Sequence, residues 1–131
     1  MRFLIAFGTD DGRNLNDDHV GMAKYFYVYE FSNGREQLVE QRENVHFVED
    51  ETIKHGDPKK AKATSSVLEG VDVLVGKKFG PNILRLLRKF VCIQARTNTI
   101  ANAIEMVRVN MDSIAGQKEK GENRKHIVLK P

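Results

Sequence analysis

A short turn bounded by glycines carries two adjacent lysines in the second half of the chain. Its sequence, residues 76–81, is Gly-Lys-Lys-Phe-Gly-Pro, and the run that follows has leucines at helical spacing. Free backbone N–H groups and the positive end of a helix dipole would add to the charge of Lys77 and Lys78. The turn is therefore a candidate anion site in which Gly76 and Gly80 shape the backbone. The alternative is that the glycines only make the turn and the lysines are solvated, since the glycine spacing of a phosphate-binding loop is absent.

His19 is the histidine best placed to hold a metal, because it lies in an acidic loop after the first apolar run and imidazole ligates iron, copper and zinc. His46 and His55 lie in a long polar segment, and the sequence leaves open whether they reach the same site. The four histidines, which include His126, show no close metal-ligand spacing. Cys92 is central in an apolar run, where a buried small hydrophobe is expected rather than a ligand.

Charged side chains follow three of the apolar runs. Asp10 and Asp11 come after the first, the lysine turn follows a later one, and Arg96 follows the next. Open α/β sheets bind ligands at the carboxyl ends of their strands, so we expect these groups at one edge of the sheet. Paired carboxylates there are also what a two-metal phosphodiester cleavage needs, although the spacing does not show that further carboxylates converge on them.

A second group of lysines stands at an unfavourable place. Lys59, Lys60 and Lys62 fall in the first turn of a predicted helix, where cations oppose the helix dipole. Either a bound anion offsets the unfavourable interaction with the helix dipole, or the three lysine side chains are exposed to solvent. We favour exposure.

Hydrophobic patterning assigns the elements that must position these residues. Residues 3–7 are continuously apolar and predict a central strand buried on both faces. Residues 24–31 and 35–42 flank a Ser-Asn-Gly turn and predict a β-hairpin. Further elements are a helix at 58–69 capped by Asp57, a strand at 71–75, a helix at 81–89, a strand at 90–95, and an amphipathic helix at 100–114 with Thr97 or Asn98 as its cap and Gly116 as its stop.

This order of elements predicts an α/β sandwich with about three helices. Its mixed five-stranded sheet combines an N-terminal antiparallel hairpin with parallel strands. A length of 131 residues fits one compact domain, which we place at residues 1–115, followed by a charged C-terminal tail at 116–131. No apolar stretch approaches the ~20 residues of a membrane span, and the lone cysteine excludes an internal disulfide framework. We therefore expect a cytoplasmic protein with no membrane partner.

The net charge of +3 is unevenly distributed. Residues 1–53 hold 5 basic and 11 acidic side chains, a net charge of −6, whereas residues 54–131 hold 16 basic and 7 acidic ones, a net charge of +9. The basic second half indicates either an anionic or nucleic-acid partner or a solvated basic face.

Four short stretches, in this order, resemble the dinitrogenase iron-molybdenum cofactor biosynthesis proteins. They are Thr-Asp-Asp-Gly at residues 9–12, His-Val-Gly-Met-Ala-Lys-Tyr-Phe at 19–26, Arg-Glu-Asn at 42–44, and Val-Asp-Val-Leu-Val-Gly at 71–76 with Gly80 and Pro81 after it. The second stretch is similar to the family's His-Phe-Gly-x-Ala-x-x-Phe and departs from it at Val20. The turn after residue 76 departs from a family turn rich in Gly-Gly. The resemblance covers about residues 2–112.

The resemblance implies a ribonuclease-H-like three-layer sandwich and a non-catalytic carrier or accessory role. Members of this family bind the iron-molybdenum cofactor of nitrogenase or its iron-sulfur precursor, so the expected ligand is an anionic metal cluster or a related small anion. His19, which matches the family motif, would be the metal ligand, and a protein partner from cofactor assembly is expected. Charge and turn geometry add to this set, so the cofactor-binding residues that we expect are His19, Asp11, Gly76, Lys77, Lys78, Gly80 and Arg96.

Two other functions remain open. One is a nucleic-acid-binding or metal-dependent nuclease-like domain that uses the basic second half together with Asp10 and Asp11, which we do not favour. The other is a protein-interaction module whose cleft is empty.

Overall fold

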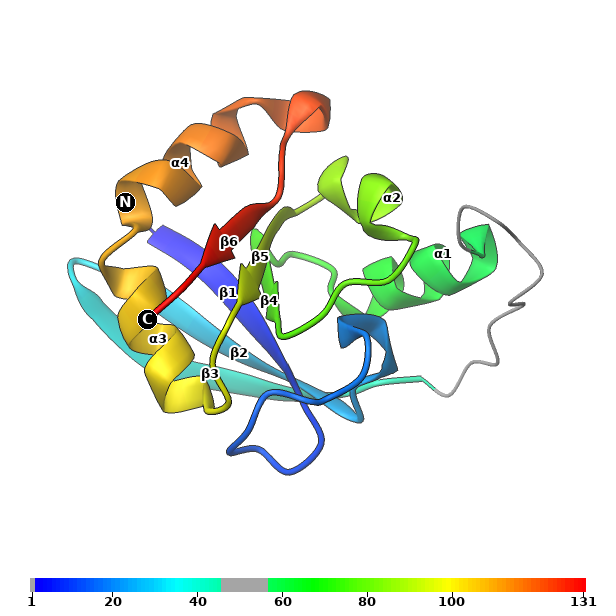
Figure 1. Ribbon diagram of the computed structural model, residues 1–131, viewed down its shortest axis with the longest axis horizontal. Helices are drawn as coiled ribbons and strands as arrows, with labels where there is room; N and C mark the ends of the chain where they lie inside the picture. Colours follow the sequence, from blue (N-terminus) through cyan, green and yellow to red (C-terminus); the bar gives the residue numbers. More distant parts are fainter. Residues whose placement is uncertain (1, 46–56) are drawn as a thin grey trace.

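The computed structural model describes residues 2–45 and 57–131, which form a mixed six-stranded sheet flanked by helices (Figure 1). The strand order is β3-β2-β1-β4-β5-β6. Strands β1 to β3 pair antiparallel, whereas β1, β4, β5 and β6 run parallel. The strands are β1 (Arg2–Thr9), β2 (Tyr25–Ser32), β3 (Arg35–Glu43), β4 (Val73–Gly76), β5 (Val91–Ala95) and β6 (Ile127–Leu129). The predicted α/β class, with an N-terminal hairpin joined to parallel strands, is confirmed.

The prediction of five strands was wrong by one, because β6 extends the sheet. This three-residue strand pairs with β5 through Ile127, Val128 and Leu129 and buries Leu129. A run of three apolar residues carries no periodicity, so only pairing with a distant strand defines β6. It lies within residues 116–131, the segment that the sequence analysis sets apart as a tail.

β1 is the central strand that its apolar run predicts. Ile5, Ala6 and Phe7 are fully buried, so both faces of the strand are covered. The hairpin of β2 and β3 is also confirmed, and its turn places Asn33 (φ 53°) and Gly34 (φ 75°) in the left-handed region. Positive φ at both central residues is the geometry that tight hairpin turns require, and Asn-Gly is the pair that adopts it most readily.

Four α-helices lie among the described residues: α1 (Pro58–Val67), α2 (Ile83–Leu87), α3 (Ile100–Arg108) and α4 (Met111–Glu119). Two short 3₁₀ turns, η1 (Val20–Met22) and η2 (Gly121–Asn123), complete the elements. The predicted start of α1 is correct, since Asp57 Oδ1 accepts a hydrogen bond from Lys59 N at 2.9 Å and Pro58 opens the helix. No helix among the described residues is both long and apolar enough to cross a bilayer.

The single helix predicted at residues 100–114 is two helices, with different ends. The cap of α3 is Thr99, not Thr97 or Asn98, and its Oγ1 accepts from Asn102 N at 3.1 Å. The helix is interrupted after α3, where the side-chain amide of Asn110 donates to Met106 O at 2.7 Å. Asparagine side chains commonly compete in this way with the backbone hydrogen bonds of a helix. Helix α4 then runs past Gly116 and ends before Gly121, whose φ of 58° suits a glycine that follows a helix.

The sheet separates two hydrophobic cores, which gives the molecule three layers. On one face, α3 and α4 cover the odd-numbered side chains of β1 through Ile100, Ala103, Val107 and Ile114. On the other face, the α1 and α2 region covers Ala6, Leu74 and Cys92 through Leu68, Leu86 and Leu87. Figure 1 shows the two helix pairs on opposite sides of the sheet. The stripe on α3 therefore has a structural role in the core.

Two basic side chains of residues 116–131 anchor this segment to the fold. Lys118 Nζ lies 2.5 Å from Asp72 Oδ1, and the other carboxylate oxygen of Asp72 accepts from Leu4 N at 2.9 Å. Arg124 donates to Lys118 O at 3.1 Å and to Leu87 O at 3.3 Å. Part of the positive charge of the second half is thus used to fix α4 and β6 against the sheet.

Candidate functional site

The turn that begins at His19 is bound to the loop after β4. Val20 N donates to Lys78 O at 2.9 Å, and His19 and Lys78 form a parallel β-bridge. The same loop contains the glycine-bounded lysine turn of residues 76–81. The structure therefore brings together His19 and the lysine turn, two features that lie about sixty residues apart in the sequence.

The glycines of the lysine turn make room for neighbouring side chains. A Cβ added to Gly76 would lie 2.6 Å from Val20 Cβ, and one added to Gly80 would lie 2.5 Å from His19 Nδ1. Gly8 at the end of β1 packs similarly, since its Cβ would lie 2.8 Å from Val20 Cγ2. A Cβ atom is essentially never found within 3.0 Å of a non-bonded heavy atom. These glycines are thus explained by close packing of the His19 turn.

The helix predicted to follow the lysine turn is present, but it begins two residues later and is shorter than predicted. Helix α2 begins at Ile83 and is five residues long, while Asn82 before it donates through Nδ2 to Asp57 O at 3.0 Å. Gly80 and Pro81 are thus part of the connection rather than of the helix. The lysine turn is thus followed by a helix of five residues, which is shorter than the helix at 81–89 that was predicted.

The two lysines of the turn differ in their surroundings. Lys77 Nζ lies 2.7 Å from Asp17 Oδ1, and this hydrogen bond lowers the pKa of the Asp17 carboxyl below its usual range. Lys78 is exposed. The positive charge available to an anion at this turn is therefore mainly that of Lys78, because the charge of Lys77 is partly offset.

Asp10 and Asp11 are committed to the loop that carries them. Asp11 accepts from Arg13 N (2.9 Å) and Asn14 N (2.8 Å) at Oδ1 and from Asn14 Nδ2 (2.8 Å) at Oδ2. These hydrogen bonds hold the pKa of Asp11 well below its usual range. Asp10 Oδ1 accepts from Lys24 N at 2.9 Å. The two carboxylates accept hydrogen bonds from backbone N–H groups of this loop. Their arrangement therefore does not support the alternative of a metal-dependent nuclease.

A groove of about 390 Å³ runs beside these caps. Its walls are polar and come from the loop after β1, the lysine turn and the start of the loop before α3; they are Asp10, Asp11, Asn14, Leu15, Asn16, Asp17, Lys77 and Asn98. Within residues 2–45 and 57–131, no group of three or more histidine, cysteine, aspartate or glutamate side chains is arranged to hold a metal ion.

Four further residues that the sequence analysis considered lie apart from the His19 turn or outside the described residues. Arg96 is exposed after β5, and its backbone N donates to Leu129 O of β6 at 2.9 Å. The thiol of Cys92 is fully buried, and burial raises its pKa to about 12, so the prediction of a buried small hydrophobe is confirmed. His46 and His55 fall in residues 46–56, outside the part of the chain that the structure describes.

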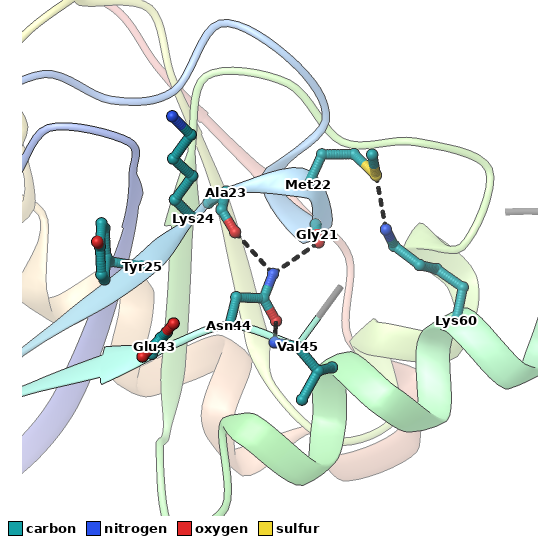
Figure 2. Close-up of a pocket in the computed structure, with 9 residues that line it drawn as sticks. All are labelled: Gly21, Met22, Ala23, Lys24, Tyr25, Glu43, Asn44, Val45 and Lys60. Carbon is teal, nitrogen blue, oxygen red and sulfur yellow. Dashed lines mark hydrogen bonds between the residues drawn. The ribbon is translucent and has the colours of Figure 1, made fainter. Parts of the chain in front are cut away.

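A second cavity, of about 240 Å³, lies on the other side of η1, and sequence reasoning missed it (Figure 2). Asn44 closes one wall: its Nδ2 donates to Gly21 O at 3.0 Å and Ala23 O at 2.7 Å. Lys60 enters from α1 and donates through Nζ to Met22 Sδ at 2.6 Å. The lining consists of Gly21, Met22, Ala23, Lys24, Tyr25, Glu43, Asn44, Val45 and Lys60.

Among the three lysines near the start of α1, Lys60 is the one that is buried. The prediction that all three side chains are exposed was therefore wrong for Lys60. It is only 7% exposed, whereas Lys59 and Lys62 are exposed. The lysines in the first turn of the helix were the available signal for a site. The sequence did not show which of the three lysine side chains points inward. Lys60 also borders a narrow pocket that His19, Gly80 and Pro81 line, so it lies between the His19 and Met22 sides of η1.

Comparison with known proteins gives one match. The model of a family described as dinitrogenase iron-molybdenum cofactor matches residues 1–110, which include η1, the lysine turn and the Arg-Glu-Asn stretch that ends at Asn44. Among curated proteins and solved structures, none matches the chain significantly. The match covers most of the 131 residues and agrees with the resemblance of the four stretches. The chain therefore belongs to the dinitrogenase iron-molybdenum cofactor family.

Proposed function

We propose that this protein is a non-catalytic carrier for an anionic metal–sulfur cluster, with His19 as a metal ligand. The cluster, either the iron-molybdenum cofactor or its iron-sulfur precursor, would be cargo that the protein takes up and passes to a partner in cofactor assembly. Family membership supports the class of cargo. The observation that carries the proposal is the position of His19, held between η1 and the lysine turn with the exposed Lys78 beside it.

The presentation of the imidazole supports this role. Nδ1, Cε1 and Cγ of His19 are the atoms nearest to Gly80, so Nε2 lies on the part of the ring away from the glycine. A neutral imidazole nitrogen with a free lone pair is a ligand for iron and related metals. Because the His19 backbone is fixed by its carbonyl, which accepts from Asn16 Nδ2 at 3.0 Å, the ring is presented from a rigid turn.

The donor set fits transient holding better than permanent storage. Cys92 is buried in the core, and both carboxylate oxygens of Asp11 accept hydrogen bonds from its own loop. The described residues thus offer one imidazole at the His19 turn rather than the thiolate set that usually fixes iron–sulfur clusters. A single strong donor helped by nearby cations suits a protein that must also release its cargo. We place this role in the reducing cytoplasm, and the 3-2-1-4-5 part of the sheet order supports a ribonuclease-H-like fold.

Anaerobic titration of the apo-protein with a preformed iron–sulfur or iron-molybdenum cluster, followed by absorbance, tests the proposal. We expect stoichiometric uptake by the wild type and loss of uptake in His19→Ala. His126→Ala is the matched control, because His126 is exposed next to β6. His19→Gln keeps a polar side chain against Gly80 and serves if the alanine variant unfolds. Absence of uptake by the wild type, or uptake by both His19 variants equal to that of the wild type, would overturn the proposal.

A further inference from the structure

We propose that the exposed face of α2, together with the lysine beside His19, is the docking surface for an acidic protein that receives the cargo. We call this surface the α2 ridge; it consists of Lys78, Pro81, Leu84, Arg88 and Lys89, all of which are exposed. The inference rests on the carrier function proposed above and deepens it, because it names a surface for the partner and the sign of the partner's charge.

The segment that carries the α2 ridge is basic and contains no carboxylate side chain. Residues 73–104 include six lysine and arginine side chains and no aspartate or glutamate. Lys77 is paired with Asp17, and it is not part of the ridge. Among the residues that the structure describes, the three cations of the ridge form no ion pair. Their charge is thus available to a partner, and a surface of one sign attracts a partner of the opposite sign.

Leu84 is an apolar side chain that the fold leaves in solvent. Its exposed fraction is 71%, whereas Leu86 and Leu87 of the same helix are each 5% exposed. Those two leucines attach α2 to the core on the α1 side of the sheet, so Leu84 is not needed for packing. Arg88 follows Leu84 by four residues and therefore lies on the same face of the helix. An apolar centre with charges around it is the usual anatomy of a protein–protein interface.

The α2 ridge begins at the His19 turn. Pro81 and His19 line the same narrow pocket, and Lys78 forms the β-bridge with His19. The loop from β4 to α2 therefore runs from the proposed metal ligand to Leu84 (Figure 1). A protein seated on the ridge would reach His19 at one end of the contact. A receiving protein needs this position, because transfer of a ligand from one protein to another requires the two sites to be close together.

The exposed leucine favours a protein partner over a nucleic acid. Contacts to phosphates use the charge of the ridge alone and leave Leu84 without a partner. Proteins that bind single strands commonly stack the bases on exposed aromatic side chains. Next to the ridge, Phe79 is half-buried and Phe90 is buried. We therefore infer a partner surface on which carboxylates surround an apolar side chain.

Titration of the isotope-labelled apo-protein with three synthetic peptides, followed by NMR, tests the ridge without any cluster. The acidic peptide is an amphipathic helix with leucines on one side and glutamates on the other. The second peptide has serine in place of each leucine, and the third has lysine in place of each glutamate. We expect the acidic peptide to shift the amide signals of residues 78–89 and to bind more weakly as the salt concentration is raised. The serine peptide should bind more weakly, and the lysine peptide should not bind.

Two pairs of variants locate the contact on the protein. We expect Leu84→Ser to weaken binding of the acidic peptide on the order of fivefold, because a few anchor side chains carry most of the binding energy of an interface. Its control, Val109→Ser, changes a side chain that is 80% exposed after α3 and should have no effect. Arg88→Gln should weaken binding about twofold, whereas Lys120→Gln, with the same change in net charge, should not. Thermal unfolding of each variant shows whether it is folded.

Single-stranded DNA of matched length is the competing probe. Tighter binding of the DNA than of the acidic peptide at residues 78–89 would overturn the inference in favour of a nucleic-acid surface. Absence of shifts at these residues with the acidic peptide would also overturn it. Equal binding of the acidic peptide by the wild type and Leu84→Ser would show that the leucine is not an anchor and would refute the proposed surface.

The outcomes separate this inference from the carrier function, because the peptide titrations use the apo-protein. If the wild type takes up the cluster through His19 but does not bind the acidic peptide, the α2 ridge is refuted and the carrier function stands. If the acidic peptide binds through Leu84 but no cluster is taken up, the docking surface stands, and the carrier function and the receiving role of the partner are refuted.

Discussion

The imidazole of His19 packs against Gly80, so closely that a Cβ on the glycine would lie 2.5 Å from Nδ1. This contact joins the turn that begins at His19 to the loop after β4. Gly80→Ala should therefore rotate the imidazole ring of His19, because a side chain moves more easily than the backbone to relieve a close contact. We expect a stability loss of about 1 kcal/mol, at the low end of overpacking costs, together with a clear loss of cluster uptake.

Urea unfolding and the anaerobic titration measure the two effects of Gly80→Ala. Gly116→Ala is the control, because no atom lies within 4 Å of its added Cβ and the residue is inside α4. Alanine there should be neutral or stabilising by about 0.5–1 kcal/mol. Unchanged uptake by Gly80→Ala would show that the ring position does not matter for cargo.

Asn44 is expected to stabilise the motif turn from the far side of the hairpin. Its amide donates to the carbonyls of Gly21 and Ala23, which lose these partners in Asn44→Ala. We expect a loss of about 1–3 kcal/mol in the free energy of unfolding, because part of a hydrogen-bonded network is left without donors. Asn123→Ala, at an exposed position in η2, should change stability by less than about 0.5 kcal/mol. Chemical denaturation of the three proteins would contradict the prediction if both variants behaved alike.

The loop cap at Asp11 should make stability depend on pH in the acid range. Its pKa in the folded protein is lowered by hydrogen bonds from Arg13 and Asn14, whereas the unfolded chain has a value of about 3.9. A group with a depressed folded pKa stabilises the fold above its unfolded pKa and loses this contribution as the pH falls further. The contribution of Asp11 to the stability of the wild type should thus be constant at neutral pH and decrease below about pH 4.

Asp11→Asn tests this dependence, since the amide oxygen can still accept hydrogen bonds but carries no charge. The difference in unfolding free energy between wild type and variant should shrink as the pH is lowered from 6 toward 2. Asp112→Asn, an exposed carboxylate on α4, is the control and should leave the pH profile of the wild type unchanged. A difference that is the same at every pH would show that the charge of Asp11 has no stabilising role.

The last strand should contribute to stability through one side chain. Leu129 is buried against the core of α3 and α4, whereas its neighbour Val128 is 36% exposed. We expect Leu129→Ala to cost about 2 kcal/mol, the lower end of the range for buried leucine because β6 is a short edge strand. Val128→Ala should cost much less. Thermal unfolding of both variants checks this order, and equal effects would mean that β6 is not part of the cooperative fold.

The sequence by itself determined the elements whose signals are local. The apolar run of β1, the Asn33–Gly34 turn, the cap at Asp57 and the stripe that begins at Ile100 were each predicted from neighbouring residues. These signals succeed because backbone φ, first-turn hydrogen bonds and burial periodicity depend mainly on residues close in the chain. The family resemblance likewise rests on short local stretches and was confirmed.

Only the tertiary structure decided how the candidate site is assembled. The pairing of Lys77 with Asp17 spans 60 positions, and β6 exists because it pairs with β5. The sequence did not show that Val20 packs against Gly76, so closely that an added Cβ would lie 2.6 Å from Val20 Cβ. Lys60, in the same first turn as Lys59, is buried because α1 packs over Gly21. Each of these features depends on contacts between distant segments, and a charge or glycine has the same local signal whether it faces solvent, a partner or the core.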